Sequence, residues 1–366
     1  MDSEIKKYIP NKWLNWFQVG VPSTNTIPGL HALRAISLSV IIFSHLQFTG
    51  FIQHKVNLFL QIYGQTALSA FFVISGFIIT KLFLIEEEKY STISLRKFYV
   101  RRILRIFPAY YFLLFVYMIL QLAGQLNLSG ISWLTSLTFT KQFCWKTDWE
   151  TAHLWSLSVE EVFYLFWPFV FLYLKKFRVK IALAFILSVV ILRMVQSPAV
   201  VKQSLTIFHH GDTLMIGCLF AIYYDKIASF VLKGNMLLNL VLLLTVLFLF
   251  VSLPKTYHAM LGERATSVIN SLFSGYGVLS NLVTAYIMIN LINLKGLGFK
   301  ILNNSIMTYL SRFSYGFYLW QQLFISFRPE FHRFSIPVIL LFVFIAANLS
   351  YIFIEKPLTD YKIKFK

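Results

Sequence analysis

Cysteine is nearly absent from this sequence, which contains only Cys144 and Cys218 among its 366 residues. Cys144 falls in an expected outer loop and Cys218 in an apolar run, so neither a disulfide framework nor a cysteine metal site is predicted. We expect no metal. The sequence also shows no cleavable signal peptide, because it opens on the charged segment MDSEIKK and its first apolar run lacks a cleavage pattern.

Charged residues are scarce as well, at 13% of the chain, whereas 57% of the residues are hydrophobic and 18% are aromatic. A soluble domain carries about 25% charged residues. These proportions, with a mean hydropathy of +0.67, therefore indicate a polytopic membrane protein. The formal net charge of +18 would suit nucleic acid, but positively charged cytosolic loops give a membrane protein the same balance. We expect membrane lipid as a partner, and no nucleic acid.

Ten apolar segments approach or exceed the roughly 20 residues that cross a bilayer as a helix. The predicted spans are 27–50, 63–85, 106–124, 154–174, 181–197, 207–224, 236–253, 267–292, 306–327 and 336–354. The predicted fold is an all-α membrane protein, a polytopic bundle of about ten transmembrane helices. Lys and Arg concentrate in one set of loops, which places both termini in the cytosol.

The domain organisation follows from these spans. Residues 1–26 are expected to form a cytosolic or interfacial segment, 27–354 the membrane domain, and 355–366 a basic cytosolic tail. Neither an internal repeat nor an interrupted helix can be read in the sequence. This argues against a secondary transporter, since such folds usually show both.

The first span carries two ionisable side chains, Arg34 and His45. Their spacing of 11 positions brings both to nearly the same helix face, roughly 16 Å apart along the axis. An arginine near the middle of a span costs about 2.5 to 3.5 kcal/mol to insert, which predicts partners inside the protein and a polar cavity along this face. The alternative is that each side chain reaches toward water from its own end of the span.

A basic run, VRRILRIFP, precedes the third span and contains Arg101, Arg102 and Arg105. On a helix these residues present guanidiniums toward one face, and each planar fork can hold two phosphate oxygens. The alternative is positive-inside topology with attraction to anionic lipid.

The segment HLWSLSVEEVFYLFWP carries four polar residues at the spacing of one helical face: His153, Ser156, Glu160 and Tyr164. Glu161 is turned away from that face. A buried carboxylate must be paired, hydrogen-bonded or protonated. Two roles are open for Glu160 and Glu161. Either they form an ion pair with a charged partner, or they orient His45, at a similar depth, as a catalytic base. The candidate partners are Arg34, Arg193 and protonated His45.

These segments, together with AFFVISGFIIT, SYGFYLW and FIEKP, resemble acyltransferase family 3, the integral membrane acyltransferases, over nearly the whole chain and in the same order. The resemblance implies an enzyme of the cell (inner) membrane that passes an acyl group, usually acetyl, from cytosolic acyl-coenzyme A to a hydroxyl. The acceptor in such proteins is a carbohydrate, such as a lipid-linked glycan, a polysaccharide, lipopolysaccharide or peptidoglycan. By position, His45 is the catalytic histidine and Glu160 and Glu161 the acidic pair.

By the same resemblance Arg102 and Arg105 lie near the coenzyme, and Arg34 is the motif partner of His45. With Arg101 from the basic run, the residues predicted to bind the coenzyme are Arg34, Arg101, Arg102 and Arg105. Weaker candidates for contacting the substrate or its oxyanion are Ser69, His153, Tyr164, Tyr318 and Gln321. Two positions depart from the family: Ser69 stands where many relatives have an acid, and Gln321 where they often have histidine. Glutamine cannot exchange a proton near neutral pH, so a second catalytic histidine is absent there.

The chemistry agrees with the residue types. A hydroxyl that attacks a thioester needs a base near neutral pH, and an imidazole is the natural choice. The sixth span begins with His209, His210 and Asp212, but adjacent histidines diverge by about 100° on a helix, which is a poor arrangement for zinc. A secondary transporter and a non-catalytic protein that binds acyl-coenzyme A remain the alternatives.

Overall fold

The structure is a computed structural model that describes residues 29–46, 54–144, 148–195, 207–232, 235–257, 262–325 and 335–358. In this part of the chain every regular element is helical, which confirms the predicted all-α class. The expected interfacial segment 1–26 and most of the basic tail lie outside the described residues.

The helices are α2 (Leu30–Leu46), α3 (His54–Tyr90), α4 (Leu95–Leu122), α5 (Gly130–Leu137), α6 (Trp149–Ala152), α7 (Leu154–Tyr173), α8 (Arg178–Val195), α10 (Ile207–Ile222), α11 (Tyr224–Leu232), α12 (Met236–Tyr257), α13 (Glu263–Phe273), α14 (Val278–Asn293), α15 (Gly296–Leu302), α16 (Ser305–Arg312), α17 (Ser314–Phe324) and α18 (Ile336–Ser350). Short helical turns are η3 (Lys141–Phe143), η4 (Lys175–Phe177) and the π turn η6 (Tyr351–Glu355).

Five helical stretches of the described residues are long and apolar enough to cross a membrane: Tyr63–Tyr90, Leu95–Leu122, Trp149–Tyr173, Arg264–Asn293 and Ile336–Leu358. A sixth is formed if α10 and α11, which are bent by 75° relative to each other, count as one span. Helix α2, at 17 residues, is shorter than a usual span. The protein is thus a multi-pass membrane protein by length and composition, while the number ten and the orientation of the termini stay predictions.

Two of the predicted spans are interrupted. The eighth is divided into α13 and α14, because the chain becomes extended at Ser274, with ψ of 175°, before α14 begins beyond Gly277. The ninth is divided into α16 and α17 at Phe313. The expectation of uninterrupted helices was therefore wrong. Around both breaks the sequence contains small and polar residues and shows no regular apolar repeat. Hydropathy alone therefore could not locate the breaks.

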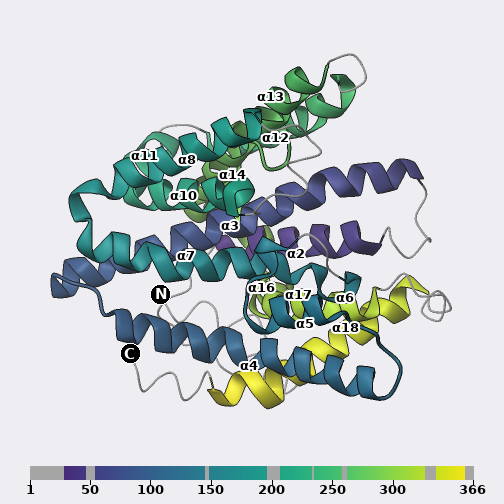
Figure 1. Ribbon diagram of the computed structural model, residues 1–366. Coiled ribbons are helices and arrows are strands. Elements are labelled where there is room, and N and C mark those ends of the chain that lie inside the picture. Colours follow the sequence, from purple (N-terminus) through teal and green to yellow (C-terminus); the bar gives the residue numbers. More distant parts are fainter. Residues whose placement is uncertain are drawn as a thin grey trace.

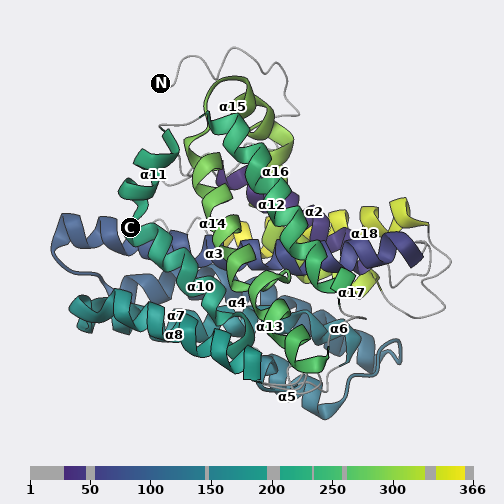
Figure 2. The ribbon, with the colours of Figure 1, turned by 90° about the horizontal axis from the view of Figure 1, so that it is seen from above.

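Helix α3 occupies the centre of the fold, packed against α2 on one side and α10 on another. Figure 1 shows α3, α7 and α4 running in similar directions, with α7 between the other two. Seen from above, α17 and α18 lie at the opposite end of the fold from α11 (Figure 2). Large hydrophobic side chains such as Phe115 on α4 and Phe166 on α7 remain exposed, as expected of a surface that faces lipid.

Two glycines allow α3 and α10 to cross closely. A Cβ atom on Gly76 would lie 2.0 Å from the carbonyl oxygen of Leu214, and one on Gly217 would lie 2.2 Å from the carbonyl oxygen of Val73. No side chain fits at either place, because real Cβ contacts do not approach below 3.0 Å. The segment AFFVISGFIIT therefore serves helix packing of the kind that small residues permit in membranes.

Helix α4 begins earlier than the predicted third span. Ser94 caps it by accepting a hydrogen bond from the Lys97 N–H, while the Ser94 N–H donates to Glu86 at 2.9 Å. The basic run therefore belongs to the first turns of this helix, and Arg102 is carried by the same rigid element that crosses the membrane. Hydropathy excluded these turns because they are rich in arginine.

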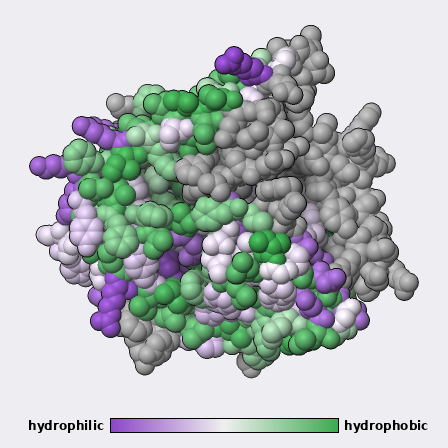
Figure 3. Space-filling model, in the orientation of Figure 1, coloured by the Kyte–Doolittle hydropathy of each residue, from purple (hydrophilic) through white to green (hydrophobic). Residues whose placement is uncertain are grey.

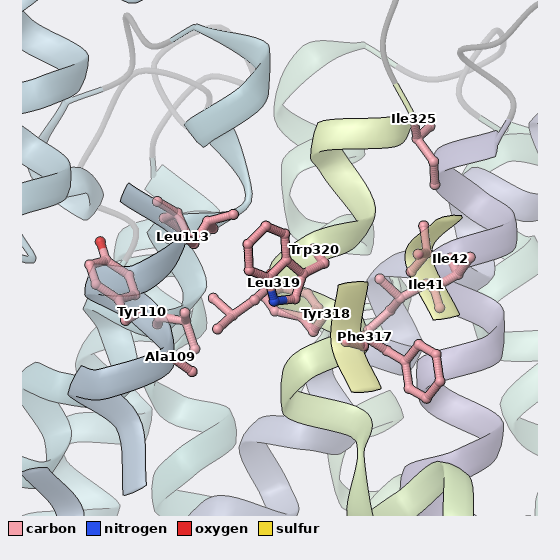
Figure 4. Close-up of a cluster of buried hydrophobic side chains, with 14 of the residues drawn as sticks. Ile41, Ile42, Ala109, Tyr110, Leu113, Phe317, Tyr318, Leu319, Trp320 and Ile325 are labelled. Carbon is pink, nitrogen blue, oxygen red and sulfur yellow. The ribbon is translucent and has the colours of Figure 1, made fainter. Parts of the chain in front are cut away.

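A hydrophobic cluster holds α17 between α2 and α4. Figure 4 shows Leu319 and Trp320 on the side of α17 that faces α4, and Phe317 on the side that faces Ile41 of α2. Helix α18 closes the cluster with Ile339. This packing fixes the rotation of α17 about its axis. It therefore also fixes the direction of the Gln321 side chain, which follows Trp320 on the same helix.

Candidate active site

Two helices bring three arginines together: Arg34 comes from α2, and Arg102 and Arg105 come from α4. Their guanidiniums act on one another electrostatically. Within the described residues none of the three forms a hydrogen bond or an ion pair, and the Nε atom of Arg34 is buried without a partner. Arg102 lies over the Tyr164 ring at 4.7 Å. Like charges held together without counter-charges in contact require water or an anion among them, so this arginine cluster is a candidate anion site.

The arginine cluster is reached by water. Arg105 is exposed, and Arg34 and Arg102 are only half-buried, although Arg105 lies among Tyr164, Glu160 and other interior groups. Figure 3 shows hydrophilic residues between hydrophobic ones on one face of the molecule. A phosphate-bearing molecule can therefore approach the guanidiniums.

Carboxylates surround the arginine cluster. Glu160 accepts hydrogen bonds from the Ser75 hydroxyl at 2.8 Å and from the Tyr164 hydroxyl at 3.0 Å. Arg102 and Arg34 act on Glu160 electrostatically, and Glu160 and Arg102 act on Glu161. The contact between Glu160 and Tyr164 confirms that these two residues share a helix face.

The expectation that the carboxylates lie at the depth of His45 was wrong. Glu160 lies seven positions after His153, which stands at the start of α7. This spacing places Glu160 roughly 10 Å from His153 along the axis of α7. Glu160 therefore lies beside the arginines. The groups near His45 are instead the Gln321 amide and the His153 ring. The catalytic role of Glu160 and Glu161 stays a prediction, and their position connects it to the arginine cluster.

Sequence reasoning missed Glu355, at the end of the π turn η6. It acts electrostatically on Arg105, about 250 positions away in the chain, and its Oε1 atom is buried without a hydrogen-bond partner. The available signal was an acidic residue at the end of an apolar segment, within FIEKP. Only the fold shows which residue it faces.

Two predicted site residues make structural contacts instead of joining the arginine cluster. Arg101 forms an ion pair of 3.7 Å with Glu86 of α3. Ser69 is buried and donates to the carbonyl of Gly275 at 3.0 Å, which fixes the break between α13 and α14. Their roles toward coenzyme and substrate stay predictions.

His45 lies at the other end of α2. Its Nδ1 atom is buried without a hydrogen-bond partner, and its ring meets the Trp149 ring edge-on, with 6.0 Å between centroids. The Gln321 amide lies beside it, yet neither Nε2 nor Oε1 of Gln321 has a hydrogen-bond partner among the described residues. Unsatisfied buried polar atoms are costly, so their concentration here marks a site for a polar ligand.

His153, at the junction of α6 and α7, is a second imidazole beside His45, on which it acts electrostatically. Its Nε2 atom lies 3.1 Å from the carbonyl oxygen of Leu319, and its Nδ1 atom has no partner. The His153 carbonyl accepts a hydrogen bond from the Tyr318 hydroxyl at 2.9 Å. Because a phenol has one proton, Tyr318 has none left for an oxyanion in this arrangement.

The loop between α4 and α7 folds over the His45 end of the fold. The Trp149 indole donates to the carbonyl of Ile325 at 2.6 Å, and the Gln322 amide donates to the carbonyl of Trp149 at 2.7 Å. Behind Trp149, the buried ammonium of Lys141 donates to the Thr151 hydroxyl at 2.7 Å. Burial lowers the pKa of Lys141 to about 8. The loop is therefore a folded part of the site.

A further buried pair was missed by sequence reasoning. Arg193 pairs with Asp212 at 2.6 Å, and not with Glu160 or Glu161 as one alternative had it. Asp212 belongs to the histidine-containing segment that begins α10, where His210 packs against the Trp155 ring and the side chain of His209 lies outside the described residues. Among the described residues, no three His, Cys, Asp or Glu side chains gather as metal ligands would.

Long apolar helices that surround an arginine cluster at one level and a histidine at another define a multi-pass membrane protein that carries ionisable side chains at two levels of its bundle. Residues 27–355 match the acyltransferase domain family, acyltransferase family 3, and the chain belongs to it, which confirms the resemblance seen in the sequence. The chain is 27% identical to the O-acetyltransferase OatA of Staphylococcus aureus strain NCTC 8325, over 92% of its length.

Another relative, the protein SACOL0978 of S. aureus strain COL, to which O-acetyltransferase activity is ascribed, is also 27% identical over 92% of the chain. In both comparisons the chain spans 58% of the relative's length. No solved structure matches the chain.

Proposed function

We propose that this protein is a membrane O-acetyltransferase. It moves an acyl group, acetyl in the first instance, from cytosolic acyl-coenzyme A to a hydroxyl of a cell-surface or lipid-linked carbohydrate, in the cell (inner) membrane. Membership of the acyltransferase family and the names of the relatives support the reaction class. The observation that carries the proposal is the placement of an unpaired arginine cluster and a histidine at two levels of one helix.

The donor is assigned to the arginine cluster. Coenzyme A carries phosphates, and Arg34, Arg102 and Arg105 offer guanidinium forks that no described protein acceptor occupies. Binding of phosphate to these groups forms charge-assisted hydrogen bonds and removes the repulsion among the three cations. Glu160 and Glu161 then limit the net positive charge of the arginine cluster, instead of orienting His45.

The reaction is assigned to the opposite end of α2. Arg34 and His45 are 11 positions apart, or roughly 16 Å along the helix, so the flexible arm of the coenzyme can carry a thioester from the arginine cluster toward the imidazole. His45 takes the proton of the acceptor hydroxyl as its oxygen attacks the thioester carbon. The C–S bond then breaks, and the thiolate of coenzyme A leaves and takes up the proton held by His45, which restores the neutral imidazole.

The developing oxyanion needs a donor. Gln321 lies beside His45 and has two amide hydrogens without a described acceptor. It fits this role better than Tyr318, whose proton is engaged. A preorganised donor of this kind is worth about 10²- to 10³-fold in kcat.

The test uses the purified protein in lipid vesicles with labelled acetyl-coenzyme A and candidate glycans. We expect labelled glycan from the wild-type protein, and a loss of about 10²- to 10⁴-fold in kcat for His45→Ala, with binding of acetyl-coenzyme A retained. A His45→Ala protein that is folded and transfers acetyl at the wild-type rate would contradict the role of His45. Binding of acetyl-coenzyme A without transfer to any acceptor would support the non-catalytic alternative.

Transfer is proposed to be direct, within a ternary complex. In that case a reaction with donor alone gives no acylated protein. Detection of a stable acyl group on His45 by mass spectrometry, in the absence of acceptor, would replace this order of steps with a two-step one.

A further inference from the structure

His153 is tied into the protein through one ring nitrogen only. The Nε2 atom lies 3.1 Å from the carbonyl oxygen of Leu319. A carbonyl can only accept a hydrogen bond, so Nε2 must carry the hydrogen, and in the neutral ring Nδ1 then has a free lone pair. The ring is 3% exposed and Nδ1 has no donor. His153 is therefore a hydrogen-bond acceptor with a fixed direction.

Contacts on both sides of His153 hold it in place. Its carbonyl accepts a hydrogen bond from Tyr318 at 2.9 Å, and the Ser156 and Tyr318 hydroxyls lie 2.6 Å apart. The Tyr318 ring packs edge-on against the imidazole, with 5.5 Å between centroids. A side chain fixed in this way loses little conformational entropy when it binds a ligand. This degree of preorganisation is typical of a recognition group.

His153 also has a particular neighbour. The rings of His45 and His153 interact electrostatically, and each has a buried Nδ1 atom without a partner. One hydroxyl has a single proton and satisfies one nitrogen at a time. As the proposed base, His45 must also offer a lone pair, so the two imidazoles together require two O–H donors, while the Gln321 amide beside His45 remains available for a carbonyl oxygen.

We propose that His153 is a specificity-determining residue that binds a second hydroxyl of the acceptor, next to the hydroxyl that His45 activates. The inference rests on the proposed function and narrows its substrate class to acceptors with two adjacent hydroxyls, as on a sugar ring. Nδ1 of His153 accepts the hydrogen bond of the hydroxyl that does not react. This contact fixes which neighbouring hydroxyl faces the thioester.

The test is a cycle of variants and acceptors. Methyl glycosides of glucose, galactose and N-acetylglucosamine, each with its monodeoxy analogues, are offered to the protein in vesicles with acetyl-coenzyme A. We expect the wild-type protein to lose about 10- to 100-fold in kcat/KM when the hydroxyl next to the acetylated one is missing, because a buried acceptor is then left unpaired.

Two substitutions separate binding from folding. In His153→Gln the amide can still donate to Leu319 from the position of Nε2, but the acceptor at Nδ1 is lost. In His153→Asn the amide oxygen can replace Nδ1, while the contact with Leu319 is lost. We expect His153→Gln to acetylate parent and deoxy glycosides at similar rates, and His153→Asn to keep most of the discrimination.

The outcomes are distinguishable. If the wild-type protein acetylates glycosides but is indifferent to the adjacent hydroxyl, or if His153→Gln keeps the full discrimination, the role of His153 is overturned and the proposed function stands. If the wild-type protein transfers acetyl to no glycoside of the panel, the proposed function fails and takes this inference with it. Binding of acetyl-coenzyme A should be unchanged in both variants.

Discussion

The guanidinium of Arg193 lies 2.6 Å from the carboxylate of Asp212, and the two side chains are 1% and 0% exposed. The pair joins α8 to α10, and Arg193 also donates to the carbonyl of Tyr276 at 2.7 Å. It thereby connects both helices to the break between α13 and α14. The pair lies apart from the arginine cluster, which makes it a test of stability separate from activity.

We expect Asp212→Asn to lower the free energy of unfolding by about 3 to 5 kcal/mol, because it leaves a buried guanidinium without its counter-charge. The double variant Arg193→Met/Asp212→Leu should lose less, since both buried charges are removed. Thermal unfolding in detergent measures the difference. A double variant less stable than Asp212→Asn would show that the ion pair itself is strongly stabilising.

The arginine cluster predicts a defect in donor binding. Arg105→Ala should raise the KM for acetyl-coenzyme A by about 10- to 100-fold, as expected for the loss of a charge-assisted contact. Arg105→Lys should recover only part of the loss, because an ammonium lacks the fork. The matched control is Arg96→Ala, which removes an exposed arginine from the same helix. Equal effects at positions 96 and 105 would point to general electrostatic attraction.

Gln321 predicts opposite effects on activity and stability. Its amide nitrogen and oxygen are both buried without partners, so Gln321→Leu removes two unsatisfied groups and should raise the unfolding temperature. The same change should lower kcat by about 10²-fold, because the oxyanion donor is lost. The two measurements are made on one preparation. A variant that is both less stable and fully active would contradict both expectations.

The close crossing of α3 and α10 predicts sensitivity to a single methyl group. In Gly217→Ala the new Cβ would lie 2.2 Å from the carbonyl oxygen of Val73, so the helices must separate, at a cost of about 1 to 3 kcal/mol or more. Gly130→Ala is the control, since a Cβ there meets nothing within 4 Å. We expect Gly130→Ala to unfold at or above the wild-type temperature.

The buried ammonium of Lys141, in the loop between α4 and α7, predicts that the stability of the folded protein depends on pH. Burial lowers the pKa of Lys141 in the folded protein to about 8, whereas in the unfolded chain it is about 10.4. Between these values the unfolded state binds more protons, so stability rises with pH across this window, by about 3 kcal/mol in total. Below pH 8 the cost of the buried charge is fully present.

This dependence is measured as the difference in unfolding temperature between the wild-type protein and Lys141→Met from pH 7 to pH 10.5. The difference removes the titration of other groups. We expect the wild-type protein to gain relative to the variant as the pH rises. A difference that stays constant would show that Lys141 has an ordinary pKa in the folded protein.

Helical periodicity predicted the parts of the site that lie on one element. The 3.6-residue repeat related Glu160 to Tyr164 and Arg34 to His45, because neighbours on one helix face follow from local geometry alone. The resemblance to the family selected these residues from many other polar ones. Helical periodicity and family motifs both concern short stretches of sequence, so they can be read without knowing how the helices pack.

Contacts between distant elements could not be predicted in this way. Nothing in a single sequence indicates that Glu355 faces Arg105, that the His153 ring bonds to Leu319, or that Asp212 neutralises Arg193. These contacts depend on how rigid helices rotate about their axes when they pack. The depth of Glu160 was misjudged for the same reason, since helix direction was known but the relative height of α2 and α7 was not.

The π turn Tyr351–Glu355 has a consequence for the C-terminal end of the chain. Such a turn takes up one more residue than an α-helical turn, and each helical residue turns the later part of the chain by about 100° around the axis. Deletion of Ile352 would restore ordinary α-helical winding and leave Glu355 near its present place, whereas deletion of a residue from α18 would turn the Glu355 carboxylate by about 100° around the axis, away from Arg105. The azimuth of Glu355 is thus set by the number of residues before it, and an insertion or deletion in α18, a helix without any arginine, would alter the charge balance around Arg105.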